Sequence, residues 1–172
     1  MEMIRELQWN DMDDLVENYY SFYDELKESP DFGIIFHRDK PSYESEIAWF
    51  SALFKLIKED DAVAVVAEVD GKVVGLCDSQ RMRPGSEISH IAVLGIAIKK
   101  GYRGKGLGEA MIKKMIELSK GKFDILKLEV FSVNTTAMKL YRRIGFVEYG
   151  TLPNAIKRGN TYYDSVHMYY QL

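Results

Sequence analysis

Two apolar runs rich in β-branched residues, Ala62–Val69 and Lys72–Arg81, lie on either side of the dipeptide Asp70-Gly71. Asp-Gly between such runs is typical of a two-residue hairpin turn, so the pattern predicts two antiparallel strands. A longer apolar run, Ile88–Ile98, predicts a deeply buried strand after the next turn. Gly95 interrupts this run, and a glycine inside a strand often marks a point where another group approaches the backbone. Gly95 is therefore a first indication of a ligand.

Helical spacing of apolar residues is found in the N-terminal part of the chain. Asn10 is a good helix cap with acidic residues after it, so a helix is expected from there to about Leu26. Ser42 predicts the start of a second helix, which reaches about Lys58. The apolar residues of this helix recur at helical spacing and are expected to be core: Ile47, Phe50, Leu53, Phe54 and Ile57. Between the two helices, Glu28–Pro41 is expected to be an irregular loop.

The remaining pattern adds further strands and helices. The expected elements are a strand at Ile4–Leu7, a helix at Leu107–Ser119, a strand at Ile125–Phe131, a helix from Asn134 to Gly145, and strands at Phe146–Lys157 and Tyr162–Gln171. Hairpins mixed with strand-helix-strand units predict an α+β fold, with a mixed, mostly antiparallel sheet of about seven strands and flanking helices. The 172 residues are expected to form a single domain.

Composition is that of an ordinary globular protein, because 47% of the residues are hydrophobic and 28% are charged. The start of the sequence lacks the basic end and apolar run of a secretory signal, and no apolar stretch approaches the ~18 residues of a membrane span. We therefore expect a cytoplasmic protein with neither a membrane nor a nucleic acid as partner. Cys77 is the sole cysteine, so no intrachain disulfide and no cysteine metal cluster can form, and no metal is expected.

Charge is divided unevenly along the chain. Residues 1–98 hold 20 acidic and 9 basic residues, whereas residues 99–172 hold 6 acidic and 14 basic residues. The net charge is therefore −11 in the first part and +8 in the second, which sums to the −3 of the whole chain. A basic part suits an anionic ligand and an acidic part suits a cationic one. The alternative is that these charges are merely solvated surface.

A glycine-rich segment at residues 101–108, with the sequence GYRGKGLG, lies between the predicted buried strand and the next helix. Backbone N–H groups at a helix N-terminus bind anions, and glycines remove the Cβ atoms that would hold an oxyanion away. Arg103 and Lys105 add positive charge. Phosphate is therefore the expected ligand of this segment.

Two common phosphate loops fit this segment poorly. A nucleoside-triphosphate loop needs a lysine and a hydroxyl residue after its last glycine, but Gly106 is followed by Leu107 and Gly108. A dinucleotide loop needs G-x-G-x-x-G directly after its strand, whereas the segment from Gly104 gives G-x-G-x-G several residues late. Glu129 does lie near the position of an acidic ribose ligand, but no second nucleotide-binding half follows. The dinucleotide interpretation remains the weaker alternative.

The segment Arg103–Gly108 matches a third pattern, [QR]-x-x-G-x-[GA], and here the sequence resembles the GNAT family of N-acetyltransferases. A second set of residues resembles that family's next strand and helix: Leu128-Glu129-Val130-Phe131, Asn134, Ala137, Leu140-Tyr141 and Gly145-Phe146. The resemblance covers residues 62–171 well. It implies the acyl-CoA N-acyltransferase fold, with acetyl-CoA as co-substrate.

The resemblance also implies which groups bind the coenzyme. Backbone groups of Ile96, Ala97 and Ile98 are expected to hydrogen-bond the pantetheine arm as an added strand would. The pyrophosphate is expected to rest on backbone N–H groups at the start of the helix: those of Arg103, Gly104, Lys105, Gly106, Leu107 and Gly108, with Glu109 beginning the helix behind them.

Two residues of the following helix complete the expected site. Asn134 is expected either to cap the helix alone or also to hydrogen-bond the cofactor. Tyr141 lies two turns further along the same helix face. The resemblance implies that Tyr141 protonates the departing thiolate of coenzyme A, as a general acid. Ala137 is small enough to let a thioester approach.

An amine must lose a proton before it can attack a carbonyl, so a base is expected. Glu87 is the first candidate, acting directly or through water, with His90 second and Asp78 third. The predicted reaction is direct attack on acetyl-CoA by the primary amine of a small molecule, an amino acid or a protein N-terminus. The alternative is a non-catalytic acyl-CoA sensor or interaction module with the same fold. A homodimer through the last strands is expected by analogy alone.

Overall fold

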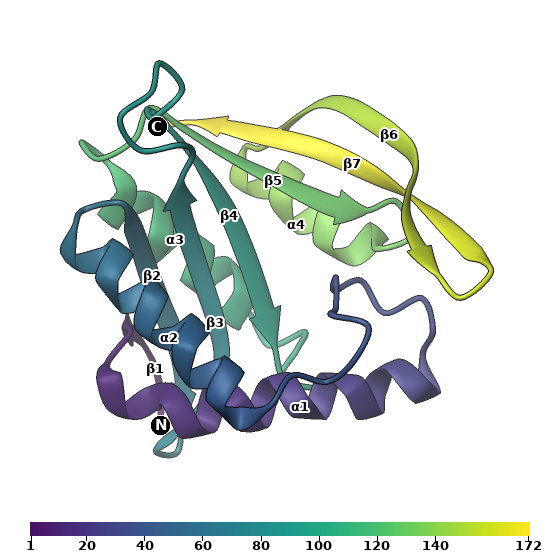
Figure 1. Ribbon diagram of the computed structural model, residues 1–172. Helices are drawn as coiled ribbons and strands as arrows, with labels where there is room; N and C mark the ends of the chain where they lie inside the picture. Colours follow the sequence, from purple (N-terminus) through teal and green to yellow (C-terminus); the bar gives the residue numbers. More distant parts are fainter.

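Seven strands form one sheet through the centre of the molecule (Figure 1). The computed structural model describes residues 1–172. The strands are β1 (Glu2–Glu6), β2 (Ala62–Val69), β3 (Lys72–Arg81), β4 (Ile91–Ile98), β5 (Ile125–Phe131), β6 (Val147–Arg158) and β7 (Thr161–Gln171). Their order is β1-β2-β3-β4-β5-β7-β6, and all neighbours are antiparallel except β4 and β5. The predicted α+β fold with a mixed, mostly antiparallel sheet is confirmed.

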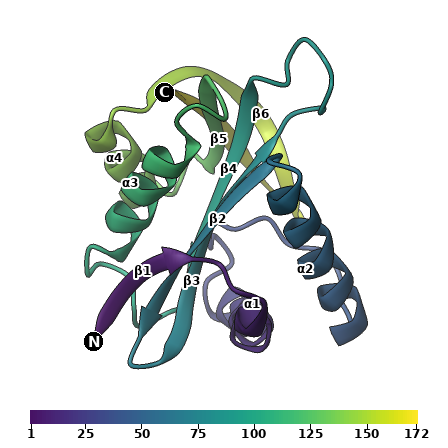
Figure 2. The same ribbon diagram turned by 90° about the vertical axis from the view of Figure 1, so that its left-hand side faces the viewer.

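Two helices cover each face of the sheet. α1 (Met12–Glu28) and α2 (Tyr43–Lys58) lie on one face. α3 (Leu107–Ser119) and α4 (Thr135–Ile144) lie on the other, as the rotated view shows (Figure 2). A short 3₁₀ turn, Trp9–Asp11, leads into α1. None of the helices combines the length and the hydropathy that crossing a bilayer requires.

The buried apolar residues form one cluster on each face of the sheet. The larger cluster has 21 residues and lies against α3 and α4, with Met111 and Met115 of α3 fully buried. The smaller cluster has 8 residues and includes Phe50 and Leu53 of α2. Burying a side chain of this size contributes about 1.5–3 kcal/mol, so these clusters fix the helices on the sheet. Cys77 is buried in the larger cluster.

Local sequence signals set most element boundaries. Asp70 and Gly71 have φ values of 50° and 79°, the positive values that the predicted tight hairpin turn requires. Ser42 caps α2, because its side chain accepts a hydrogen bond from the N–H of Ser45 at 3.2 Å. Gly145 ends α4 with a φ of 116°. From β2 onward the strand and helix bounds follow the pattern closely, except at the start of β4.

Two predicted boundaries are wrong. Asn10 does not cap α1 but lies in the 3₁₀ turn, where the side chain of Asp11 accepts from the N–H of Gln8 at 2.7 Å. β4 begins at Ile91 instead of Ile88. The segment before it forms turns, because several of its N–H groups bond to carbonyls three residues earlier instead of to a neighbouring strand.

Candidate active site

β4 and β5 separate part-way along their length, which opens a gap in the sheet. Their parallel pairing covers only Ile91–Val93 against Ile125–Lys127, whereas β4 stays paired with β3 as far as Ile98. Alternate residues of a strand direct their backbone groups to opposite sides, and the N–H of Lys99 bonds back toward β3. The N–H and C=O of Ile96 therefore point into the gap, where no strand receives them.

The glycine-rich loop connects β4 to α3 at the end of β4 where the gap is wide (Figure 1). Gly104 and Gly106 have φ values of 74° and 88°, which glycine adopts without strain. No atom lies within 4 Å of a Cβ placed on either residue, so the space beside the loop is open. None of the backbone N–H groups from Arg103 to Glu109 donates a hydrogen bond within the protein. Free N–H donors at a helix N-terminus are the groups that an anion site requires, so binding of a phosphate here stays a prediction.

Arg103 directs its side chain toward α1. Its guanidinium donates to both carboxylate oxygens of Glu25, a residue only 8% exposed, and lies 4.6 Å from the centre of the Phe32 ring. Its Nε donates to the C=O of Ile98 at 2.6 Å. The prediction that the Arg103 side chain adds free positive charge for phosphate is therefore wrong, because Glu25 neutralises that charge. The backbone N–H of Arg103 stays available for an anion.

Two other basic residues near the loop also pair with acids of α1. Lys99 contacts Glu17 at 2.8 Å and Lys100 contacts Glu28 at 2.6 Å. The uneven charge along the chain is thus partly an internal complementarity between α1 and the loop. Lys105 has no ion pair, and its ammonium lies 5.4 Å from the centre of the Tyr102 ring. Lys105 is the basic side chain that this loop leaves free for a ligand.

The first turn of α3 packs closely on β4 and α4. Leu107 is buried in the larger core cluster. A Cβ placed on Gly108 would lie 3.3 Å from Cδ2 of Leu140 and 3.5 Å from Cδ1 of Ile98. A larger residue at this position would push α3 outward, so Gly108 serves the packing of the helix start.

Glu109 joins α3 to α4. Its carboxylate contacts Lys113 at 2.8 Å and Arg143 at 2.6 Å, and these two cations lower the pKa of Glu109. The carboxylate is therefore occupied by protein partners, and the residue offers an anion only its backbone N–H.

Asn134 caps α4, because its Oδ1 accepts a hydrogen bond from the N–H of Ala137 at 3.2 Å. A Cβ placed on Gly33 would lie 2.6 Å from Nδ2 of Asn134, so the loop between α1 and α2 passes directly over this side chain. Of the two roles expected for Asn134, the helix cap is confirmed, and a hydrogen bond to a cofactor stays a prediction.

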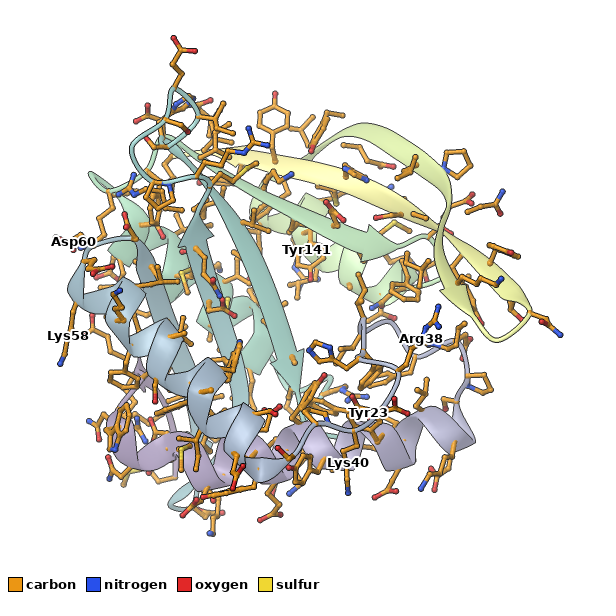
Figure 3. All side chains as sticks on the ribbon, viewed as in Figure 1. Tyr23, Arg38, Lys40, Lys58, Asp60 and Tyr141 are labelled. Carbon is orange, nitrogen blue, oxygen red and sulfur yellow. The ribbon has the colours of Figure 1, made fainter.

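Tyr141 of α4 belongs to the larger core cluster, and Figure 3 shows it beside the gap between β4 and β5. It is 7% exposed, and its hydroxyl makes no hydrogen bond to the protein. The Tyr141 hydroxyl oxygen is nevertheless not fully enclosed. A fully enclosed polar side-chain atom without a hydrogen-bond partner occurs at one place in the protein, which is His167 Nε2. Burial, with a smaller effect of Cys77, raises the pKa of Tyr141 above its ordinary value. The phenol therefore keeps its proton at neutral pH, as a general acid must.

Asp78 of β3 lies opposite Gly95 of β4, just past the point where β4 and β5 separate. Its neighbours Cys77 and Ser79 face α3, so Asp78 faces the opposite side, toward α1 and α2. Gln80 Nε2 donates to its Oδ2 at 2.8 Å, and a Cβ placed on Gly95 would lie 3.5 Å from its Oδ1. Burial raises the pKa of Asp78 from 3.8 to about 6, which suits a general base near neutral pH.

A cavity of about 620 Å³ opens on the same face of the sheet as Asp78, beneath α1, α2 and the loop that connects them. Leu76 and Ala97 pair across β3 and β4 in its floor, one same-face step from Asp78 and Gly95. Its walls include Leu15, Tyr19 and Phe22 from α1 and Glu46 and Trp49 from α2. The volume lies within the ~300–1,000 Å³ of small-molecule sites.

The loop over this cavity is held from the far end of the sheet. Arg158 of β6 donates to the C=O groups of Pro30, Phe32 and Ile34 at 2.7, 2.8 and 2.7 Å. Arg103 holds the same loop from the other side through its contact with the Phe32 ring. The loop is therefore fixed between the glycine-rich segment and the β6–β7 hairpin.

The family profile described as "Acetyltransferase (GNAT) family" matches residues 3–146. The chain belongs to the GNAT family. This confirms the resemblance that the Arg103–Gly108 segment indicates.

Two curated GNAT relatives show how far the similarity extends. The chain is 34% identical over 107 residues to the L-amino acid N-acetyltransferase AaaT of Escherichia coli, and the aligned region covers 60% of this chain and 65% of that protein. It is 32% identical over 149 residues to the uncharacterized N-acetyltransferase MJ1207 of Methanocaldococcus jannaschii, and the aligned region covers 84% of this chain and 60% of that protein. The chain thus spans less than two thirds of the length of either relative.

Solved GNAT structures share the fold at lower identity. The ribosomal-protein-alanine N-acetyltransferase of Brucella melitensis superposes with a TM-score of 0.83 at 24% identity, covering 99% of each chain. The yncA structure of Salmonella typhimurium, which contains its cofactor acetyl-CoA, superposes with a TM-score of 0.85 at 18% identity, covering 100% of this chain and 94% of that one. These superpositions establish the GNAT fold.

Two of the three base candidates do not reach the gap of this GNAT protein. Glu87 and His90 are exposed in the turns before β4, at the end where β4 and β5 are still paired. The expected strand Ile88–Ile98 put Glu87 at its mouth and His90 within it, because the apolar pattern places the start of the strand too early. Of the three candidates, Asp78 lies beside the separated strands.

Sequence reasoning did not single out Glu46 or Arg158. Glu46 lies four residues before Phe50 and seven before Leu53, so helical spacing does place it on the buried face of α2. An acidic residue in line with the apolar residues of the helix was therefore the signal that could have identified Glu46. Arg158 gave no signal, because the carbonyls that it binds are more than 120 residues away in sequence.

Proposed function

We propose that this GNAT protein transfers the acetyl group of acetyl-CoA to a primary amine. The observation that carries the proposal is the run of unpartnered N–H groups from Arg103 to Glu109, beside the open backbone of Ile96. Tyr141 adds an unpaired hydroxyl next to the same gap. The names of AaaT and of the Brucella melitensis protein, both N-acetyltransferases, support this assignment.

The residues fit acetyl-CoA. A diphosphate suits the amides at the N-terminus of α3, with Lys105 as the free cation of the loop. An extended pantetheine arm suits the free N–H and C=O of Ile96, to which it would add like a strand. When bound, acetyl-CoA supplies an acetyl group activated as a thioester.

The two proton-transfer groups flank the gap from opposite faces of the sheet. Asp78 faces α1 and α2, where the acceptor cavity lies, and Tyr141 lies on the side of α3 and α4. In the proposed reaction the amine attacks the thioester directly, a C–N bond forms and the C–S bond breaks. Asp78 takes the proton that the amine nitrogen releases, and Tyr141 donates its proton to the departing sulfur. A proton passed from Asp78 back to Tyr141 through solvent restores the site.

The acceptor enters from the cavity side. We propose a small amine, an amino acid or a protein N-terminus as acceptor, with the loop above the cavity as the selective element. The names of the relatives, an L-amino acid and a ribosomal-protein-alanine N-acetyltransferase, support the last two classes. The cavity is apolar enough to receive a side chain or aliphatic stem, since Leu15, Phe22 and Trp49 line it.

Thiol release from acetyl-CoA tests the proposal. The protein is incubated with acetyl-CoA and a panel of amino acids, alkylamines, diamines and short peptides, and free thiol is followed with acetylated product by mass spectrometry. Release that depends on both enzyme and amine is the expected result. If no amine yields thiol or product while acetyl-CoA still binds, the protein is a non-catalytic acyl-CoA sensor instead.

A further inference from the structure

Glu46 is a largely buried residue whose carboxylate has no partner in the protein and stays open to a cavity. It lies on α2, is 8% exposed, and lines the cavity on the acceptor face of the sheet. Its side chain has no hydrogen bond and no ion pair, whereas Glu17, Glu25 and Glu28 of the neighbouring helix α1 are each paired with a cation. Burying an unpaired carboxylate is costly, and burial raises the pKa of Glu46. A cavity that keeps such a group is built to receive a cation.

The other charged residues around this cavity lie at its mouth. His37, Arg38 and Asp39 belong to the exposed loop above it. The charges at the mouth are of both signs and remain hydrated. The buried interior carries the negative charge of Glu46.

The cation is organic. A calcium or magnesium ion needs several oxygen ligands, whereas Glu46 is the lone buried acid among apolar walls that include Phe22, Trp49 and Leu76. An ammonium on an aliphatic stem satisfies both features, because the stem covers the apolar walls and the ammonium pairs with the carboxylate.

A second carboxylate stands further along the same face. Asp78 lies one same-face step beyond Leu76, and Gly95 opposite it adds no side chain beside that carboxylate. The acceptor face therefore presents Glu46 in the cavity wall and, next to the floor residues Leu76 and Ala97, the carboxylate of Asp78.

We propose that the preferred acceptor is a diamine-type molecule, in which an aliphatic spacer joins the reacting primary amine to a second ammonium. Glu46 binds the distal ammonium, and Asp78 receives the proton of the reacting one. This inference rests on the proposed acetyl transfer. If the protein prefers an amino acid acceptor, bound through its carboxylate by Arg38, the diamine inference is wrong.

Matched pairs of acceptors test the inference. The kcat/KM values for putrescine, cadaverine and hexamethylenediamine are compared with those for n-butylamine, n-pentylamine and n-hexylamine. We expect a diamine preference of about 10- to 100-fold at the best spacer length, the value of one charge-assisted hydrogen bond. Glu46→Gln is expected to reduce that preference to about one through KM. Glu44→Gln, an exposed acid of the same helix turn, should leave it unchanged.

The outcomes separate this inference from the proposed function. If amines are acetylated but monoamines equal diamines, or amino acids exceed both, the inference is overturned and the acetyl transfer stands. If no amine is acetylated, the rise in melting temperature that cadaverine causes still reports on Glu46. A rise in the wild type that Glu46→Gln abolishes supports the cation site, and no rise, or an equal rise in both proteins, overturns it.

Discussion

Arg103 of the glycine-rich loop donates to both carboxylate oxygens of Glu25, a buried residue near the end of α1. The same guanidinium contacts the Phe32 ring in the loop over the acceptor cavity. The segment that offers its amides to a diphosphate is thereby joined to the helix and loop that shape the acceptor side. The proposed coenzyme and acceptor sites are therefore joined through the side chain of Arg103.

Glu25→Gln should destabilise the protein, because it leaves the guanidinium of Arg103 facing a neutral amide. The expected loss is about 1.5–3 kcal/mol in the free energy of unfolding, measured by urea titration. Glu28→Gln removes an exposed ion pair with Lys100 from the same helix end and should cost at most ~1 kcal/mol. Equal, small losses for the two substitutions would show that the Arg103–Glu25 pair stabilises the protein no more than the exposed Lys100–Glu28 pair.

Gly106→Ala should weaken coenzyme binding in addition to its cost for the fold. Gly106 has a φ of 88°, so an alanine there costs about 1–2 kcal/mol of stability. Gly121 has a φ of 79° and equally open surroundings in a turn elsewhere, so Gly121→Ala is a matched control for that strain. Calorimetric titration with coenzyme A should show about 10-fold or greater loss of affinity for Gly106→Ala alone. Equal affinities in the two variants would remove the loop from the binding site.

Tyr141→Phe should lower kcat by about 10²- to 10⁴-fold, the usual value of a general acid, and leave coenzyme affinity unchanged. Tyr170→Phe is the control, because it removes a hydroxyl from a ring in similar packing. The ring centre of Tyr170 lies 5.3 Å from that of Phe146, and the ring centre of Tyr141 lies 5.8 Å from the same ring. Single-turnover rates measure the chemical step directly. A Tyr141→Phe enzyme as fast as the Tyr170→Phe enzyme would exclude the phenol as the proton donor.

Asp78→Asn should abolish the acid limb of the pH profile. In the wild type, kcat/KM is expected to rise with pH through about 6, the pKa of Asp78, because the carboxylate accepts the proton only when it is ionised. The variant should lose about 10²- to 10⁴-fold at its plateau and show no limb near that pH. Glu87→Gln should keep the wild-type profile. The reverse pattern would return the role of base to Glu87.

The same substitution should stabilise the fold at high pH. Burial raises the pKa of Asp78 from 3.8 in an ordinary setting to about 6, so the charged form is disfavoured in the folded protein. Its contribution is fully favourable below the ordinary pKa and is lost as pH rises through the folded one. Asp78→Asn is therefore expected to gain up to about 3 kcal/mol at about pH 8 and little at about pH 4. A variant less stable than the wild type at the higher pH would contradict the buried-carboxylate account.

Most of the fold follows from local signals in the sequence. The Asp70-Gly71 turn, the Ser42 cap and the Gly145 helix end act within a few residues, and each lies where the pattern places it. The start of β4 was misplaced because an apolar run does not reveal whether its first residues find a neighbouring strand. The separation of β4 from β5 is likewise a property of pairing between distant segments.

The sequence predicts the backbone part of the candidate site better than it predicts the partners and positions of its charged side chains. The glycine spacing indicates an anion-binding loop, and the amides of that loop are free in the structure. The partner of Arg103 could not be foreseen, because Glu25 lies 78 residues earlier in the sequence. The positions of Asp78 and Glu87 depend on where the strands diverge, which no local pattern records.

The most direct test of the central claim is a crystal structure of this protein with coenzyme A. The account predicts diphosphate oxygens within hydrogen-bonding distance of the backbone N–H groups between Arg103 and Gly108, and the coenzyme sulfur beside the hydroxyl of Tyr141. Coenzyme A bound elsewhere, or with its sulfur on the far side of the sheet from Tyr141, would contradict it.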